Sequence, residues 1–160
     1  MPKKLNSFII PDEVVKEMRI KLREGLLNDI ELGFSLCRDQ NSNIVKVGEQ
    51  CIGGECSIIT PSTCKGNDIY VGAYHTHPNE SSRPSSQDIP VIYNKNRGFA
   101  CIGGFEGYKE EIKCYTRSTP KDIEAIYRFK DKLAHTIDRT EERKEIDKFV
   151  KDNFRVIDII

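Results

Sequence analysis

The sequence has no excess of charge of either sign. Lys plus Arg number 25 among its 160 residues, and Asp plus Glu also number 25, so the formal net charge is zero. A chain without a net positive field has no general electrostatic attraction to nucleic acid or to an anionic membrane surface. We therefore expect neither as a partner, and any partner must be recognised by local shape and local charge.

Long hydrophobic runs are also absent. The apolar patch before Pro11 is three residues long, which is too short for a signal-peptide core or a membrane span. We therefore expect a cytoplasmic protein. Internal repeats and low-complexity segments are absent as well, which excludes a repeat array.

The cysteines lack the spacing of a structural zinc site. They are at positions 37, 51, 56, 64, 101 and 114, and the intervals after Cys51 and Cys56 do not form the paired pattern of such sites. A cytosolic chain of this length can be stable on its hydrophobic core without covalent links. We therefore predict six free thiols that pack as small hydrophobic residues.

The first third of the chain predicts a helix followed by a strand. Pro11 suits a helix N-terminus, and apolar residues then recur at helical spacing as far as Leu26. From Ile30 to Cys37 apolar residues alternate with Glu31 and others, which is the period of a half-buried strand. Glu31 is therefore expected to point away from the apolar row.

The rest of the chain continues the alternation of element types. We predict a strand over 69–74, a helix that begins near Ser85, two strands over 99–102 and 111–116 joined by a turn at Gly103 and Gly104, and a helical region after Pro120. This order predicts one α+β or α/β layered domain. Residues 1–117 form its expected core, and residues 118–160 a helical part packed on it or extending it.

Two histidines and an aspartate form a candidate metal site. His75 and His77 are one residue apart at a predicted strand end, so both project from the same face. A catalytic zinc uses three protein ligands and keeps one position open, and Asp88 on the following helix supplies the third. Taken singly, the histidines could be ordinary polar residues, and Ser85 and Asp88 could be a simple capping box.

The complete spacing is His-x-His-Pro, six residues, then Ser-x-x-Asp, in the segment HTHPNESSRPSSQD. It resembles the signature of the JAMM or MPN+ (JAB domain) zinc metallopeptidases. The resemblance is dense over residues 75–88 and generic beyond residue 117. It implies a curved mixed β-sheet flanked by helices, with an architecture similar to that of cytidine deaminases, and one Zn²⁺ per chain held by His75, His77 and Asp88 with a bound catalytic water.

The resemblance also implies two catalytic residues. A glutamate near the start of an early strand contacts the water in the family, and Glu31 lies at the matching place; Glu24, Glu49, Glu55 and Glu80 are the competitors. The family usually has glycine three residues after this glutamate, whereas here Phe34 stands there and Gly33 comes one residue earlier. Glu31 would act as acid and base, and Ser85 would donate to the oxyanion, with a surface glutamate and a helix cap as the alternative interpretations.

Zinc sites of this general kind occur in proteins with different functions. A base deaminase needs His-x-Glu and Pro-Cys-x-x-Cys, neither of which occurs here. An active enzyme resembling the family would hydrolyse peptide or isopeptide bonds, as a deubiquitinase-like isopeptidase that trims or processes ubiquitin-like or sulfur-carrier protein tails. The alternative is a non-catalytic MPN-fold module for binding or assembly. A homodimer through the terminal helices is a further expectation.

Overall fold

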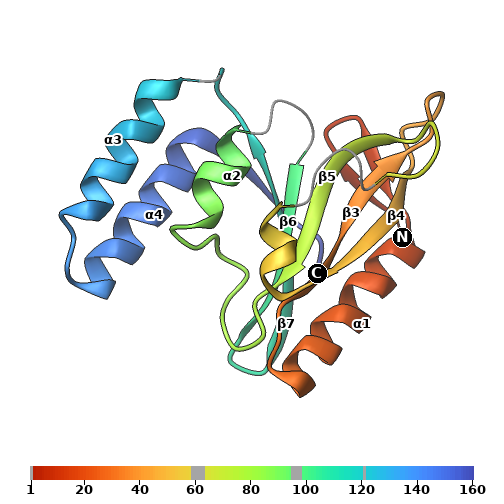
Figure 1. Ribbon diagram of the computed structural model, residues 1–160, viewed down its shortest axis with the longest axis horizontal. Helices are drawn as coiled ribbons and strands as arrows, with labels where there is room; N and C mark the ends of the chain where they lie inside the picture. Colours follow the sequence, from red (N-terminus) through yellow and green to blue (C-terminus); the bar gives the residue numbers. More distant parts are fainter. Residues whose placement is uncertain (1, 59–63, 95–98, 121) are drawn as a thin grey trace.

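The computed structural model describes residues 2–58, 64–94, 99–120 and 122–160 as an α+β fold (Figure 1). Its elements, in chain order, are β1 (Lys3–Leu5), β2 (Phe8–Ile10), α1 (Asp12–Asn28), β3 (Leu32–Arg38), β4 (Val45–Ile52), the 3-10 helix η1 (Gly53–Ile58), β5 (Ile69–Thr76), α2 (Asp88–Asn94), β6 (Phe99–Glu106), β7 (Lys109–Arg117), α3 (Ile123–Ala134), α4 (Arg139–Asn153) and β8 (Phe154–Asp158).

Six strands form one mixed sheet in the order β4-β3-β5-β6-β7-β8, and β1 and β2 form a small separate sheet. Only the β5 and β6 pair is parallel within the large sheet; the other neighbours are antiparallel. The chain passes from β5 to β6 through α2, as a parallel pair requires a crossover. The C-terminal end of β5 and the start of α2 therefore lie at the same edge of the sheet.

Helices cover both faces of this sheet. Figure 1 shows α1 on one side and α2, α3 and α4 on the other. The side chains of β6 alternate accordingly: Cys101 packs in the cluster that contains α1, and Ala100 and Ile102 pack in the cluster that contains the other helices. The central strands consequently have two buried faces.

Helix α1 forms where the sequence predicts it. Pro11 precedes the first turn, Asp12 and Glu13 place negative charge near its N-terminus, and the chain leaves the helix at Asp29 in the left-handed conformation. Val14, Met18 and Leu22 are buried on the sheet side. Their spacing places one apolar stripe against β3, β5 and β6.

Strand β3 differs from its prediction in burial. Residues 33–37 are all buried, and Ser35 on the supposedly exposed row is fully buried. The reason is position: β3 lies between β4 and β5, and both faces of it are covered there. The alternation of the sequence gives the direction of each side chain but not what lies above it.

Gly103 and Gly104 are not a hairpin turn. Both lie inside β6, and the chain reverses at Gly107 and Tyr108, with Gly107 at φ +62°. A Cβ on Gly103 would overlap the ring of Tyr74, and a Cβ on Gly104 would overlap the backbone of residues 80–82. These glycines allow close approach rather than a turn.

The C-terminal part contains more than helices. Asp122 and Asp138 cap α3 and α4 through bonds from the backbone N–H groups two residues later, so the charged stretch after Asp138 begins a helix rather than interrupting one. Beyond α4 the chain forms β8, which pairs antiparallel with β7. Ile159 is fully buried in the α1 cluster.

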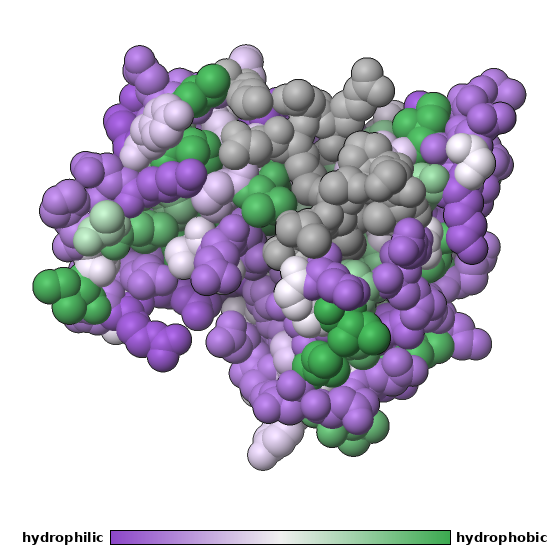
Figure 2. Space-filling view, in the orientation of Figure 1, coloured by the Kyte–Doolittle hydropathy of each residue, from purple (hydrophilic) through white to green (hydrophobic). Residues whose placement is uncertain are grey.

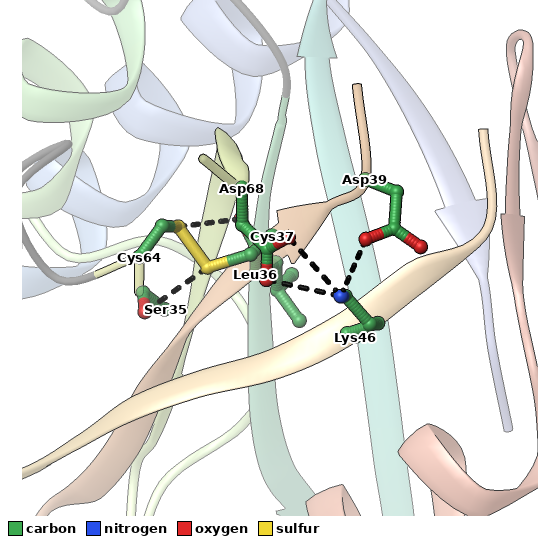
Figure 3. The surroundings of a disulfide bond; sticks show 7 residues. All are labelled: Ser35, Leu36, Cys37, Asp39, Lys46, Cys64 and Asp68. Carbon is green, nitrogen blue, oxygen red and sulfur yellow. Dashed lines mark hydrogen bonds and ion pairs between the residues drawn. A yellow bond between two sulfur atoms is a disulfide. The ribbon is translucent and has the colours of Figure 1, made fainter. Parts of the chain in front are cut away.

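The prediction of six free thiols is wrong. The cysteines form three disulfides, Cys37–Cys64, Cys51–Cys56 and Cys101–Cys114, and none is free. Chain length showed only that disulfides are dispensable, whereas pairing depends on strand register, which places Cys101 directly opposite Cys114. Figure 3 shows Cys37–Cys64 beside Lys46, whose Nζ lies 2.9 Å from Asp39 Oδ1 and 3.0 Å from Asp68 Oδ2.

In the described residues no helix is long and apolar enough to cross a membrane. The cytoplasmic location stays a prediction. Disulfides are more common in oxidising compartments, and therefore they do not support it.

Thiol titration tests the disulfides. The unfolded, unreduced protein should show no reactive thiol, and the reduced protein should show six. Reduction should also lower the free energy of unfolding, because each disulfide restricts the unfolded chain; a loop of the Cys101–Cys114 size is worth about 3 kcal/mol in the chain-entropy treatment. Urea unfolding with and without reductant measures this loss, and six thiols in the unreduced protein would contradict the pairing.

Candidate metal centre

The end of β5 directs two histidines toward the α2 side of the sheet. Tyr74 points to the opposite side, where its hydroxyl donates to the carbonyl of Met18 in α1 at 2.8 Å. Side chains alternate along a strand, so His75 and His77 both face away from α1. The backbone N–H of His77 donates to the carbonyl of Gly103 at 2.7 Å, which holds this segment against β6.

Asp88 is held by a reciprocal capping box at the start of α2. Its backbone N–H donates to Ser85 Oγ at 3.2 Å, and the N–H of Ser85 donates to Asp88 Oδ2 at 2.8 Å. The capping interpretation of this pair is therefore correct. The ligand interpretation is compatible with it, because a carboxylate accepts several interactions at once.

The ligand atoms of the three residues converge on one point. His75 Nε2 lies 3.2 Å from His77 Nε2, Asp88 Oδ1 lies 3.4 Å from His75 Nε2, and Asp88 Oδ2 lies 3.2 Å from His77 Nε2. Asp88 approaches each histidine with a different oxygen, and one ligand atom from each of the three residues lies within 4.8 Å of the other two. The two imidazoles and the carboxylate are donor types that zinc prefers, so this compact group could hold a zinc ion. Among the described residues, no other group of three His, Cys, Asp or Glu side chains is close enough to hold a metal ion.

The surroundings prepare the histidines for a cation. His77 Nδ1 lies 3.0 Å from the carbonyl of Ser81, which favours the tautomer with hydrogen on Nδ1 and leaves Nε2 as the ligand atom. Burial lowers the pKa of His77, but Asp88, the carbonyl of Ser81 and the charge of Glu31 together outweigh burial and leave that pKa raised. Burial likewise works against ionisation of Asp88, but His75 and His77 hold its pKa far below the ordinary value.

Glu31 lies beside this group, immediately before β3. Its backbone carbonyl accepts from Gly53 N–H at 2.7 Å, and the neighbouring Leu32 N–H donates to Thr76 Oγ1 at 3.0 Å. Burial raises the pKa of its carboxyl group, with a smaller contribution from Asp88, while the histidines oppose the rise. A cation held by the three ligands would lower this pKa again. The glutamate is therefore within electrostatic reach of all three ligands.

One pocket of about 260 Å³ brings the candidate residues together. Glu31, His75, His77, Ser85 and Asp88 all line it, together with Gly54 and Cys56 of η1 and Val91 and Ile92 of α2. Of the competing glutamates, Glu80 also lines the pocket. The other three, Glu24, Glu49 and Glu55, are exposed and lie outside its lining. Glu80 is thus the one rival to Glu31 in the described chain.

Ser85 lies at the pocket wall with its oxygen already engaged. In the capping bond Ser85 Oγ is the acceptor, so its hydroxyl hydrogen is not used by that bond. The same hydroxyl can therefore cap α2 and donate into the pocket.

Sequence reasoning missed several parts of the site. The carbonyl of Ser81 carries no signal in the sequence because any residue has one. The wall formed by η1 also could not be foreseen, since it depends on the Cys51–Cys56 disulfide and on the pairing of β4 with β3. Val91, by contrast, lies on the predicted apolar helix that follows Asp88.

No family model matches the chain, and no curated protein matches it. Solved structures do match. A protein from Salinibacter ruber has a TM-score of 0.46 and 14% identity, with 67% of this chain and 80% of that chain covered. Protein DSY2949 from Desulfitobacterium hafniense has a TM-score of 0.44 and 15% identity, with 66% and 81% covered. At this level of similarity the matches carry no argument about function.

Metal analysis tests the site. The purified protein should hold one zinc per chain, and the double substitution His77→Ala with Asp88→Ala should remove it, because one ligand alone does not retain a structural or catalytic zinc. Ser85→Ala is the matched control: it removes the cap of α2, at about 1 kcal/mol, but leaves all three ligands in place. Zinc retained by the double variant, or lost from the control alone, would contradict the assignment.

Proposed function

We propose that this protein is a zinc-dependent hydrolase of the JAMM or MPN+ type that cleaves peptide or isopeptide bonds. The observation that carries the proposal is that the ligand atoms of His75, His77 and Asp88 lie within 4.8 Å of one another in a pocket that Glu31 also lines. Three protein ligands leave a fourth tetrahedral position open, which distinguishes catalytic from structural zinc sites.

His75, His77 and Asp88 would hold the zinc ion, which when bound would polarise a carbonyl group and lower the pKa of water to about 7. The protein's own contribution is positioning and proton transfer. The carboxylate of Glu31 accepts a proton from the attacking water and returns it to the leaving amine, so the same group acts first as base and then as acid. Burial raises the pKa of Glu31, whereas a cation bound by the three candidate ligands would lower it, so the two effects oppose each other at this carboxyl group.

Ser85 has a second role in this proposal. Its hydroxyl donates to the oxygen of the carbonyl under attack, where negative charge develops as the tetrahedral state forms. The capping bond to Asp88 fixes the position of Ser85 Oγ, so the donor is in place before the substrate binds. Donors placed in advance do not have to reorganise during the reaction.

The pocket fits a polypeptide better than a large cofactor. Its volume of about 260 Å³ lies below the usual range for drug-sized ligand pockets, and residues of η1 and α2 form part of its lining. A protein tail presented in extended form would place one bond at the centre while the rest lies outside. Tails of ubiquitin-like or sulfur-carrier proteins remain the proposed substrate class, and a homodimer through the terminal helices remains a prediction.

A non-catalytic module of the same fold is the competing proposal. It would use the three ligands for a structural metal or for none, and it would have no need for a glutamate in the metal pocket. The location of Glu31 in that pocket favours the enzyme.

Substitution Glu31→Gln separates these proposals. It preserves side-chain size and removes the ability to accept a proton, while the zinc ligands are untouched. Zinc content should stay normal, and hydrolysis of a ubiquitin-like isopeptide conjugate should fall roughly a hundred- to ten-thousand-fold, as expected for loss of a positioned general base. Metal analysis and a cleavage assay on the same preparation measure both.

Two variants complete this experiment. Glu49→Gln, on the exposed edge strand β4 and outside the pocket, is the matched control and should retain activity. Glu80→Gln tests the rival in the pocket. If Glu80→Gln abolishes hydrolysis and Glu31→Gln does not, Glu80 is the base; if the wild-type protein binds zinc but cleaves no conjugate or peptide, the non-catalytic module is favoured.

A further inference from the structure

A second cavity adjoins the candidate metal centre on the side of α4. It has a volume of about 320 Å³ and lies between the loop that follows His77 and the N-terminal half of α4. Glu80, Ser85 and Gln87 line both this cavity and the metal pocket. A chain that occupies the metal pocket can therefore extend past Ser85 into the second cavity.

The distinctive feature of this cavity is three arginines. Arg83 comes from the loop, and Arg139 and Arg143 come from the first two turns of α4. Most residues that line the cavity are polar or charged, and Figure 2 shows mostly hydrophilic residues over α3 and α4 on the face in view. The cavity is therefore suited to a polar group rather than to an apolar side chain.

The arginines differ in how far they are already neutralised. Arg83 Nη1 lies 3.4 Å from Asp147 Oδ2, whereas Arg143 Nη1 is 3.5 Å from a hydroxyl, that of Ser81. Within the described chain neither Arg139 nor Arg143 forms an ion pair. Two guanidinium groups at the cavity therefore retain donors for a ligand.

Acidic groups nearby offset most of this positive charge. Glu80 and Glu142 line the cavity and Asp147 pairs with Arg83, so three negative side chains stand against the three arginines. Asp138 caps α4 by accepting from the N–H of Thr140 at 2.7 Å, which offsets part of the positive end of that helix. An anion is therefore favoured here only by the local pair of Arg139 and Arg143, and a polyanion would also meet Glu80 and Glu142.

The planar guanidinium group matches a carboxylate through two parallel hydrogen bonds. We infer that this cavity is a specificity subsite that binds an acidic side chain of the polypeptide substrate through Arg139 and Arg143. The inference rests on the proposed function for its substrate class. Since an extended chain advances about 3.3–3.6 Å per residue, the acidic residue lies within a few residues of the scissile bond.

A binding experiment on metal-free protein tests the subsite without any need for hydrolysis. The probes are three fluorescein-labelled, amide-capped peptides that differ only at two central positions, which are both Glu, both Gln or both Lys. A fourth peptide has Gln at these positions and a free C-terminal carboxylate. Fluorescence anisotropy at low salt should show that the Glu peptide binds at least roughly tenfold more tightly than the Gln and Lys peptides. This is the difference expected from one charge-assisted hydrogen-bonded pair between an arginine of the cavity and a peptide carboxylate.

The variant is Arg139→Gln with Arg143→Gln, and the matched control is Arg128→Gln with Lys130→Gln, which removes the same charge from the exposed surface of α3. The first should lose the preference for Glu, and the control should keep it. Three results would overturn the inference. The wild type could bind the Glu and Gln peptides equally, or the first variant could keep the preference for Glu. Tighter binding of the free-carboxylate peptide than of the Glu peptide would be the third.

This result is independent of the outcome at the metal centre. Loss of the Glu preference in the α4 variant supports the subsite even if Glu31→Gln shows no catalytic defect. Conversely, if Glu31→Gln abolishes hydrolysis but the wild type shows no preference for the Glu peptide, the proposed function stands and the subsite is wrong.

Discussion

The face of the sheet to which each side chain of β5 points determines which residues line the pocket. Tyr74 is fully buried on the α1 side, its hydroxyl bonds to the Met18 carbonyl, and Gly103 leaves room for its ring on the neighbouring strand. With Tyr74 fixed in this way, period-two alternation directs His75 to the opposite face. A slip of one residue would exchange the two side chains and bury the histidine under α1, at the cost of an unsatisfied polar group there.

The loop between His77 and Asp88 is the second fixed component. Its backbone lies against Gly104, the N–H of Phe105 donates to the Glu80 carbonyl at 2.8 Å, and the hydroxyl of Tyr115 donates to the Ser82 carbonyl at 2.8 Å. These bonds place the Ser81 carbonyl at Nδ1 of His77. The ligands are thus oriented by groups that belong to the sheet, and a rigid element positions a metal site more accurately than a free loop does.

Local sequence patterns predicted that His75, His77 and Asp88 lie together, as the structure shows, whereas the features that they missed depend on long-range strand pairing. The spacing of His75, His77 and Asp88 predicts the directions of their side chains, because these directions depend only on the local period of one strand and one helix turn. The disulfides and β8 depend instead on which strand lies beside which. Phe154 follows α4 without a glycine or proline to mark the change, so the helical pattern seemed to continue. Gly103 and Gly104 carried a turn signal, but their neighbours Tyr74 and residues 80–82 are distant in sequence.

The electrostatics of the pocket favour a cation whatever the function is, and for that reason the ligands alone do not distinguish an enzyme from a structural site. His77 retains a raised pKa and Asp88 a lowered one because each stabilises the charge of the other; a metal ion would take the place of the proton between them. Glu31 is different. Burial and, to a smaller extent, Asp88 oppose its negative charge and raise its pKa, although His75 and His77 act in the opposite direction. A purely structural site would do better with an uncharged residue there, so the position of a partly buried glutamate beside three candidate metal ligands supports the proposal of proton transfer.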